Sequence, residues 1–173
     1  MTQPYSPLPT LKDIFALSAE LIALANAQKM TVGTAESCTG GLIGAAITAI
    51  PGSSSVFKGG IISYANAVKI QQLNIPAEMI DNHGAVSQGV AEAMAKNARD
   101  VLNVDIAISV TGVAGPGGGS VEKPVGMVWM GLATPHGTTT QCHQFGDIGR
   151  NKVRDVTCFE ALKAICNTLK LNA

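Results

Sequence analysis

The sequence predicts a single α/β domain with three layers, α/β/α, and a mixed β-sheet, and two observations lead to this prediction. Helical and strand-like segments alternate over the first two thirds of the chain, a pattern typical of parallel strands connected by helices. Two more strand-like segments are joined by Thr134-Pro-His-Gly137, a hairpin signal that adds antiparallel strands. Since 173 residues are about one domain's length, we expect the domain over residues 11–173, after a proline-rich flexible lead over residues 1–10.

Hydrophobic periodicity and cap signals place the individual elements. Thr10 and Asp13 form a capping-box pattern at the start of the first helix. Asn66 and Ser87 are the expected caps of two later helices. In chain order, we expect a helix over 11–29, a strand over 30–35, a helix over 42–49, a strand over 56–64, short helices from 66 and from 76, a helix over 88–102, strands over 105–111, 125–133 and 138–145, and a helix over 150–169.

Composition argues against several classes of protein. Twelve Lys and Arg balance twelve Asp and Glu, and a neutral chain is a poor match for the phosphates of nucleic acid. The longest nearly apolar run, residues 40–50, is too short for a bilayer, and no signal peptide is visible. We therefore expect a cytoplasmic protein with no membrane partner, in which Cys38, Cys142, Cys158 and Cys166 are reduced thiols. Because only 14% of the residues are charged, we also expect a homo-oligomer.

Ser37 lies in a turn of small residues, Thr34-Ala-Glu-Ser-Cys-Thr-Gly-Gly41, between a buried strand and a helix. Either its hydroxyl caps that helix, or it is a nucleophile beside N–H groups that would hold an oxyanion. The G-x-S-x-G pattern of serine hydrolases is absent, since Ala35 and Thr39 stand at the glycine positions. Cys38 is a rival nucleophile, although an inert buried thiol is the commoner state of such a residue.

A serine nucleophile needs a base, and Tyr64-Ala-Asn-Ala-Val-Lys69 offers one. A lysine acts as a base when desolvation among apolar neighbours lowers its pKa. The alternative is an ordinary surface lysine near the start of a helix. None of His83, His136 and His143 occurs in a motif that connects it to Ser37, so each is expected to be solvated or structural.

A glycine-rich loop, Gly112-Val-Ala-Gly-Pro-Gly-Gly-Gly-Ser120, follows the strand that ends at Thr111. Ligands of α/β folds bind beyond the carboxyl ends of strands, and glycines let a backbone approach a phosphate or sugar closely. The loop matches neither the Walker A pattern nor the G-x-G-x-x-G fingerprint. It is either a ligand-contacting loop or a flexible surface loop.

Arg150 and Arg154 lie one turn apart at the start of the last expected helix. Cations at this end oppose the helix dipole, and an anionic ligand would remove that conflict. The alternative is a pair of solvated arginines. No spacing of His, Cys, Asp or Glu matches a zinc or calcium site, so we expect no metal.

Taken together, the motifs resemble the CinA C-terminal domain family over about residues 11–169. Family members commonly read Gly-Asp-Arg before the last helix, whereas this chain reads Gly146-Asp-Ile-Gly-Arg150, with two additional residues. The stretches that carry the resemblance are Thr34-Ala-Glu-Ser-Cys-Thr-Gly-Gly41, Tyr64-Ala-Asn-Ala-Val-Lys69, His83-Gly-Ala-Val-Ser87, Thr111-Gly-Val-Ala-Gly-Pro-Gly-Gly-Gly119 and Lys123-Pro-Val-Gly126.

The resemblance implies a hydrolase of the nicotinamide-nucleotide amidase class. Such members convert nicotinamide mononucleotide to nicotinate mononucleotide and ammonia in pyridine-nucleotide (NAD) recycling, without a metal or organic cofactor. By resemblance, Ser37 is the nucleophile, Lys69 the base and Tyr64 the tyrosine of the family. The expected oxyanion or substrate-binding residues are Cys38, Thr39, Gly40, Gly41, Thr111, Gly112, Ala114, Gly115 and Arg150. We expect no activity of the separate N-terminal domain that longer members carry.

Two other functions fit the same residues. One is a non-catalytic nucleotide-binding or regulatory module, in which Ser37 is only a cap and a phosphate ligand. The other is an amidase for a different primary amide. Whether Arg150 or Arg154 would contact a phosphate is left open by the sequence.

Overall fold

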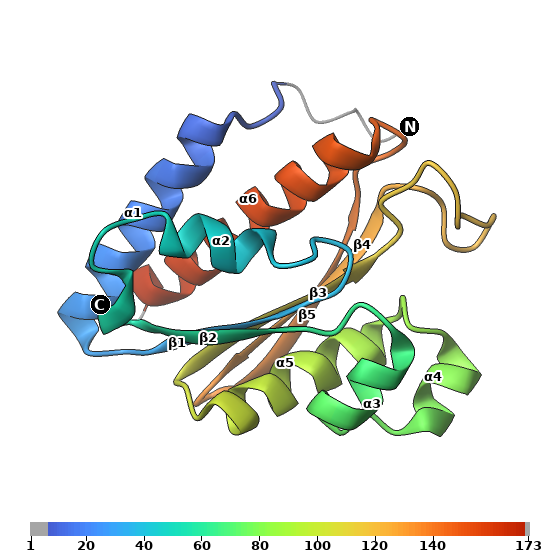
Figure 1. Cartoon of the computed structure of the whole chain (residues 1–173), viewed down its shortest axis with the longest axis horizontal. Helices are drawn as coiled ribbons and strands as arrows, with labels where there is room; N and C mark the ends of the chain where they lie inside the picture. The colour runs from blue at the N-terminus through green and yellow to red at the C-terminus, as the bar shows by residue number, and fades with distance from the viewer. Residues whose placement is uncertain (1–6, 172–173) are drawn as a thin grey trace.

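The computed structural model describes residues 7–171, and these form a five-stranded sheet with helices on both faces (Figure 1). The strand order is β2-β1-β3-β4-β5; β1 is parallel to β2 and β3, β4 is antiparallel to β3, and β5 is antiparallel to β4. The predicted mixed sheet is therefore confirmed. The strands are β1 (Val32–Glu36), β2 (Phe57–Ile62), β3 (Ile106–Gly112), β4 (Met127–Thr134) and β5 (Gly137–Gln144). Most of the expected lead over 1–10, residues 1–6, lies outside the described residues.

The helices form the two outer layers. On one face lie α1 (Leu11–Gln28), α2 (Leu42–Thr48) and α6 (Arg150–Leu171), and on the other lie α3 (Asn66–Leu73), α4 (Ala77–His83) and α5 (Gln88–Leu102) (Figure 1). Each face has its own apolar core, and neighbouring residues of β3 alternate between them: Ile108 packs in the first core and Ala107 in the second. Within residues 7–171 we find no helix that combines the length and the apolar character needed to cross a membrane.

Of the three expected helix caps, Thr10 is confirmed, Asn66 is wrong, and Ser87 takes the cap position without the side-chain bond of a cap. At α1 the capping box is present, since Asp13 N–H donates to Thr10 Oγ1 and the Asp13 carboxylate accepts from Thr10 N–H. Asn66 is not a cap: it is the first residue of α3, and Ala65 takes the cap position. Ser87 does precede α5, but its hydroxyl donates to the carbonyl of Gly84 instead of accepting from the helix.

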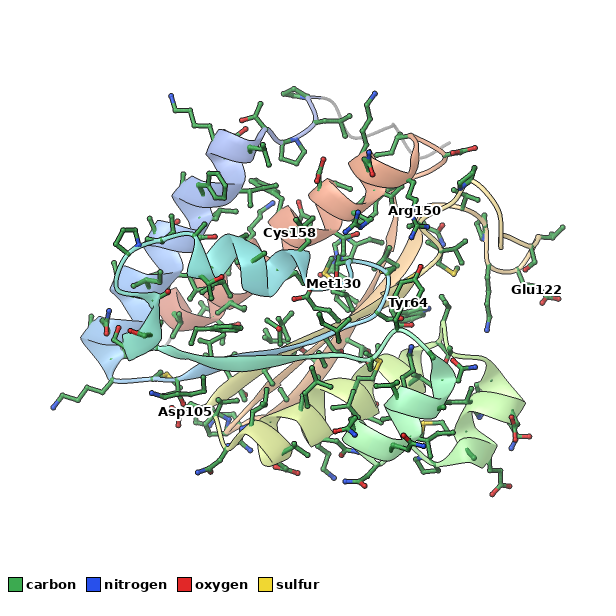
Figure 2. All side chains as sticks on the ribbon, viewed as in Figure 1. Tyr64, Asp105, Glu122, Met130, Arg150 and Cys158 are labelled. Atoms are coloured by element: carbon green, nitrogen blue, oxygen red, sulfur yellow. The ribbon has the colours of Figure 1, made fainter. Side chains whose placement is uncertain are left out.

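Parallel pairing brings the carboxyl ends of β2, β1 and β3 to one edge of the sheet. The residues that follow these strands therefore meet, although they lie far apart in the sequence. Figure 2 shows Tyr64, just after β2, near Arg150 at the start of α6, whereas Asp105, at the amino end of β3, lies at the opposite end of the molecule.

Gly126 joins the segment after the glycine-rich loop to the start of β4. Its N–H donates to the carbonyl of Val113 and its carbonyl accepts from Phe145 N–H. Its φ is +87°, in the left-handed region, and a Cβ built on it would lie 2.5 Å from the backbone nitrogen of Gly146. A side chain at this position would therefore meet both backbone strain and a rigid backbone contact.

We predict that Gly126→Ala lowers the free energy of unfolding by about 3 kcal/mol, the combined cost of a left-handed residue and of overpacking. The matched control is Gly117→Ala in the same loop, where an added Cβ meets no atom within 4 Å. Urea unfolding followed by circular dichroism measures both variants. Equal unfolding midpoints for the two would contradict the prediction.

Candidate active site

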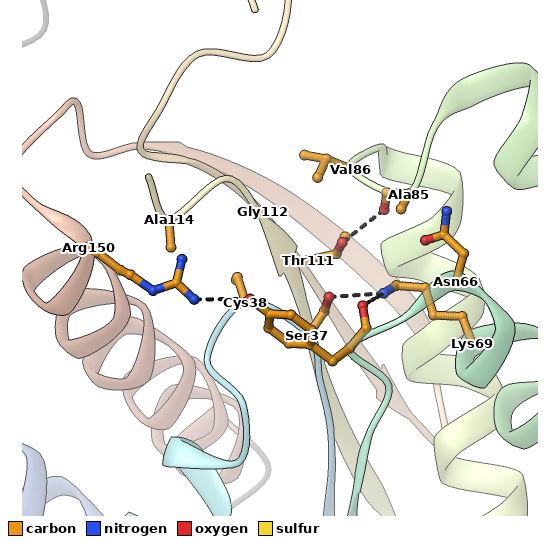
Figure 3. A pocket seen from close by; sticks show the side chains of 11 residues that line it. Ser37, Cys38, Asn66, Lys69, Ala85, Val86, Thr111, Gly112, Ala114 and Arg150 are labelled. Carbon is orange, nitrogen blue, oxygen red and sulfur yellow. Dashed lines mark hydrogen bonds between the residues drawn. The ribbon is translucent and has the colours of Figure 1, made fainter. Parts of the chain in front are cut away.

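A pocket of about 210 Å³ opens at the carboxyl edge of the sheet (Figure 3). Many of the predicted site residues line it: Ser37, Cys38, Tyr64, Lys69, Thr111, Gly112, Ala114 and Arg150. Asn66, Ala85 and Val86 also line it, although the sequence had not identified them as site residues. The structure thus brings together segments that follow β1, β2 and β3 with the start of α6.

Ser37 and Lys69 meet at the base of this pocket. Lys69 Nζ lies 2.9 Å from Ser37 Oγ, within a hydrogen bond. The lysine comes from the first turn of α3, whose position directly after β2 aims its side chain back toward the end of β1 (Figure 3). A serine and a lysine that are 32 residues apart in the chain are therefore direct partners.

The surroundings of the Lys69 amine favour its neutral form. Lys69 is only 1% exposed, and burial lowers the pKa of its amine below the usual value for lysine. In the described part of the chain, no carboxylate forms an ion pair with it. The sequence-based alternative of a surface lysine is wrong.

Two backbone carbonyls set the direction of the amine. Nζ lies 2.6 Å from the carbonyl oxygen of Ser63 and 3.3 Å from that of Tyr64. A neutral amine has two N–H donors and one lone pair. If both donors serve these carbonyls, the lone pair faces the hydroxyl of Ser37, and this is the arrangement that a general base requires.

Ser37 is not a helix cap, so that interpretation is also wrong. The cap position of α2 belongs to Gly41, and the hydroxyl of Ser37 is bonded to Lys69 instead. The N–H groups at the start of α2 are served by the carboxylate of Glu36, which accepts from Gly41, Ile43 and Gly44. The hydroxyl of Ser37 is thus not used to cap α2.

The predicted oxyanion donors divide into two groups. Gly40 N–H donates to the carbonyl of Ser37, and Gly41 N–H donates to Glu36, so both are already used. Cys38 lines the pocket, whereas Thr39, Gly40 and Gly41 do not. The backbone N–H groups of Cys38 and Thr39 therefore remain as the candidate donors in this turn.

Cys38 is a poor alternative nucleophile. Its side chain is buried, and desolvation raises the pKa of its thiol to about 12. A thiol reacts as the thiolate, which this environment disfavours. Cys38, Cys142, Cys158 and Cys166 are all free thiols, as predicted.

The glycine-rich loop forms one wall of the pocket. Thr111 is buried and its hydroxyl donates to the carbonyl of Ala85, which ties β3 to the segment before α5. At Gly112 a Cβ would lie 2.6 Å from the carbonyl oxygen of Met127, so only glycine lets β4 approach here. Gly115 does not line the pocket, but its carbonyl accepts from Arg150.

The two arginines at the start of α6 have different partners. Arg150 lines the pocket and donates to the carbonyl of Gly115 and to the hydroxyl of Tyr64, each at 3.0 Å. Arg154 instead donates to the carbonyl of Thr39 at 2.8 Å, outside the pocket lining. Of the two, Arg150 is the one placed to meet a ligand.

Histidines take no part in the pocket lining. His83 ends α4, His136 lies in the hairpin turn, and His143 is buried on β5, where it stacks on Phe145 with ring centroids 5.2 Å apart. Within residues 7–171, no cluster of His, Cys, Asp and Glu has the composition of a metal site.

Fold and site together define an α/β/α domain with a serine and a buried lysine paired in a pocket. The chain belongs to the CinA C-terminal domain family, whose model matches residues 14–169. This confirms the resemblance seen in the motifs.

Curated relatives support the same assignment. The chain is 50% identical over 148 residues to a CinA-like protein of Parasynechococcus marenigrum, which covers 85% of this chain and 35% of that protein. It is 49% identical over 142 residues to a CinA-like protein of Synechocystis sp., covering 81% and 34%. The chain therefore spans about a third of the length of these relatives.

Solved structures share the fold over nearly their full length. The competence/damage inducible protein CihA from Agrobacterium tumefaciens superimposes with a TM-score of 0.89 at 40% identity, covering 96% of this chain and 99% of that one. The competence damage-inducible protein A (ComA) from Klebsiella pneumoniae gives 0.87 at 30% identity, covering 91% and 97%.

Burial of Lys69 predicts a specific pH dependence of stability. The pKa of its amine is lowered in the folded state, so the unfolded chain binds more protons below the ordinary lysine pKa of ~10.4. The stability cost of this burial is therefore largest at low pH and disappears as the pH rises toward that value. Lys69→Met has no such cost. We predict that its unfolding free energy, relative to the parent protein, is higher at pH 7 than at pH 10.

The measurement is urea unfolding of both proteins across this pH range. Lys58→Met, at an exposed position, is the control and should show a constant difference from the parent. A constant difference for Lys69→Met as well would show that the folded protein does not shift the titration of this amine.

Proposed function

We propose that this protein is an amidohydrolase in which Ser37 attacks a primary carboxamide and Lys69 is its base, with nicotinamide mononucleotide as the substrate. The observation that carries the proposal is the 2.9 Å contact between Ser37 Oγ and a buried lysine amine without a carboxylate partner. The choice of substrate is supported by the motifs shared with the amidase members of the family.

The first half of the reaction forms an acyl-enzyme. Neutral Lys69 takes the proton of the Ser37 hydroxyl as Oγ bonds to the amide carbon. The resulting ammonium returns that proton to the amide nitrogen, which leaves as ammonia when the C–N bond breaks. Lys69 is then neutral again and Ser37 carries a nicotinoyl ester.

The second half releases the product by the same proton path. Water takes the place of ammonia, Lys69 accepts its proton, and the oxygen attacks the ester carbon. Ser37 leaves with the proton returned from Lys69, and nicotinate mononucleotide departs. In both halves the N–H groups of Cys38 and Thr39 would hold the oxyanion, a contribution of typically ~3–4 kcal/mol for each donor.

Arg150 is the proposed contact for the substrate phosphate. It is a guanidinium at the pocket, and it donates at present only to uncharged oxygens, those of Gly115 and Tyr64. A phosphate would form stronger, charge-assisted bonds with it. The hydroxyl of Tyr64, now bonded to Arg150 and not to the catalytic pair, would be released by that exchange.

We predict that Ser37→Ala lowers ammonia release from nicotinamide mononucleotide by ~10³-fold or more, since no other activated nucleophile replaces it. Cys38→Ala, one residue away, should retain most of the activity because it keeps the backbone N–H. Ammonia is measured by a coupled assay, and substrate binding to Ser37→Ala by its thermal shift. Binding by the parent protein without ammonia release would favour the non-catalytic module instead.

We predict that Arg150→Ala raises the KM for nicotinamide mononucleotide ~10–100-fold, the value of a lost hydrogen bond to a charged group. The KM for nicotinamide riboside, which lacks the phosphate, should not change. Arg154→Ala removes the same charge outside the pocket lining and should not discriminate between the two substrates. Equal effects of Arg150→Ala on both substrates would argue against a phosphate contact.

A further inference from the structure

The carboxylate of Glu36 is buried at the centre of the turn that carries Ser37. Glu36 is 1% exposed, and four groups donate to it: Thr39 Oγ1 at 2.7 Å and the N–H groups of Gly41, Ile43 and Gly44 at 3.0, 3.0 and 2.8 Å. Within residues 7–171, no basic side chain forms an ion pair with it. Neutral donors alone therefore compensate the buried charge.

Glu36 makes contacts on either side of Ser37, through its backbone on one side and its side chain on the other. Its own backbone belongs to β1, where its carbonyl accepts from Ser63 N–H at 2.8 Å. Its side chain reaches past Ser37 to residues that follow it in the chain, and Ser37 N–H is held by the carbonyl of Val110. The turn is thus clamped to the sheet at one end and to the carboxylate at the other.

We propose that Glu36 is a positioning residue for the reaction: its carboxylate holds the 37–41 turn in the one conformation that aims Ser37 Oγ at Lys69 and leaves the N–H groups of Cys38 and Thr39 for the oxyanion. This inference rests on the proposed amidase function and extends it. A neutral cap would satisfy one or two donors, whereas this carboxylate satisfies four.

A cleft beside Glu36 makes this role testable. It has a volume of about 150 Å³ and lies between α2 and β2. Its lining includes Glu36, Thr34, Gly41, Gly44 and Gly60. A small carboxylate could therefore reach the position of the Glu36 side chain once that side chain is truncated.

The experiment is chemical rescue of Glu36→Ala by formate, which supplies a carboxylate and little else. We expect kcat for ammonia release to fall ~100-fold or more, as when an oxyanion donor is lost, with KM within about threefold because the groups proposed to bind the nucleotide stay in place. Formate should restore kcat by at least tenfold, with saturation, and chloride at equal ionic strength should not.

The matched control is Asp105→Ala. The Asp105 carboxylate accepts from Thr31 N–H and from Thr31 Oγ1, at 2.7 and 2.8 Å, at the opposite end of the molecule from Tyr64 and Arg150 (Figure 2). Removing it also deletes a carboxylate that holds a backbone turn, so stability should fall. Its kcat should stay within threefold of the parent value, and formate should have no effect.

Glu36→Gln provides a second test if the alanine variant does not fold. The amide oxygen can keep the three donors that meet Oε2, and only the bond from Gly44 N–H is lost. We expect a smaller loss of kcat, about tenfold, with the pH midpoint of kcat unchanged, since Glu36 acts through geometry. A shifted midpoint would overturn the positioning role, and so would a kcat within threefold of the parent in either Glu36 variant.

The two proposals can fail separately. If the parent protein releases no ammonia from the nucleotide, the proposed function fails. The hold of Glu36 on the 37–41 turn is then tested by the melting temperature. Formate should raise the melting temperature of Glu36→Ala and leave those of the parent and of Asp105→Ala unchanged. No formate effect on a folded Glu36→Ala would overturn the inference.

Discussion

The pocket depends on a lysine amine that is kept out of water and in contact with a serine hydroxyl. Lys69 can be buried because the carbonyls of Ser63 and Tyr64 accept from it and because Ser37 takes its third position. The short link between β2 and α3 provides both carbonyls, and the first turn of α3 provides the lysine. β2, the link that follows it and α3 therefore act together to orient the amine of Lys69.

Two buried ionisable groups lie next to Ser37, Glu36 in the sequence and Lys69 in space, and their surroundings differ. Glu36 is surrounded by donors, which suits a carboxylate, whereas Lys69 meets two carbonyls, a hydroxyl and apolar surroundings. Solvent exclusion strengthens each of these local interactions. Four donors hold the Glu36 carboxylate in place, and desolvation lowers the pKa of the Lys69 amine and so favours its neutral form.

The sequence was sufficient for the mixed α/β/α architecture, because strand and helix periodicities were clear and the hairpin signal was local. Through their motifs it also indicated that Ser37 and Lys69 belong to one site, and the structure places their side chains in contact. The sequence misplaced the cap at Asn66 and predicted a capping bond from Ser87 that is not formed, because cap preference describes a residue type and not the partner that its side chain finds in the fold. The contacts of Glu36 could not be predicted from the sequence, since an acidic residue in a turn is usually solvated and its four donors are recognisable only in three dimensions. Asn66, Ala85 and Val86 reach the pocket only through the packing of separate elements.

The contribution of α6 has a consequence for how the protein is made. Of the described elements α6 is translated last, yet Arg150 and Arg154 from its first turns donate to the carbonyls of Gly115 and Thr39. While α6 is still inside the ribosome, a nascent chain lacks both guanidinium contacts and the apolar residues that α6 adds to the first core. Completion of the site is thereby coupled to the end of synthesis of this domain.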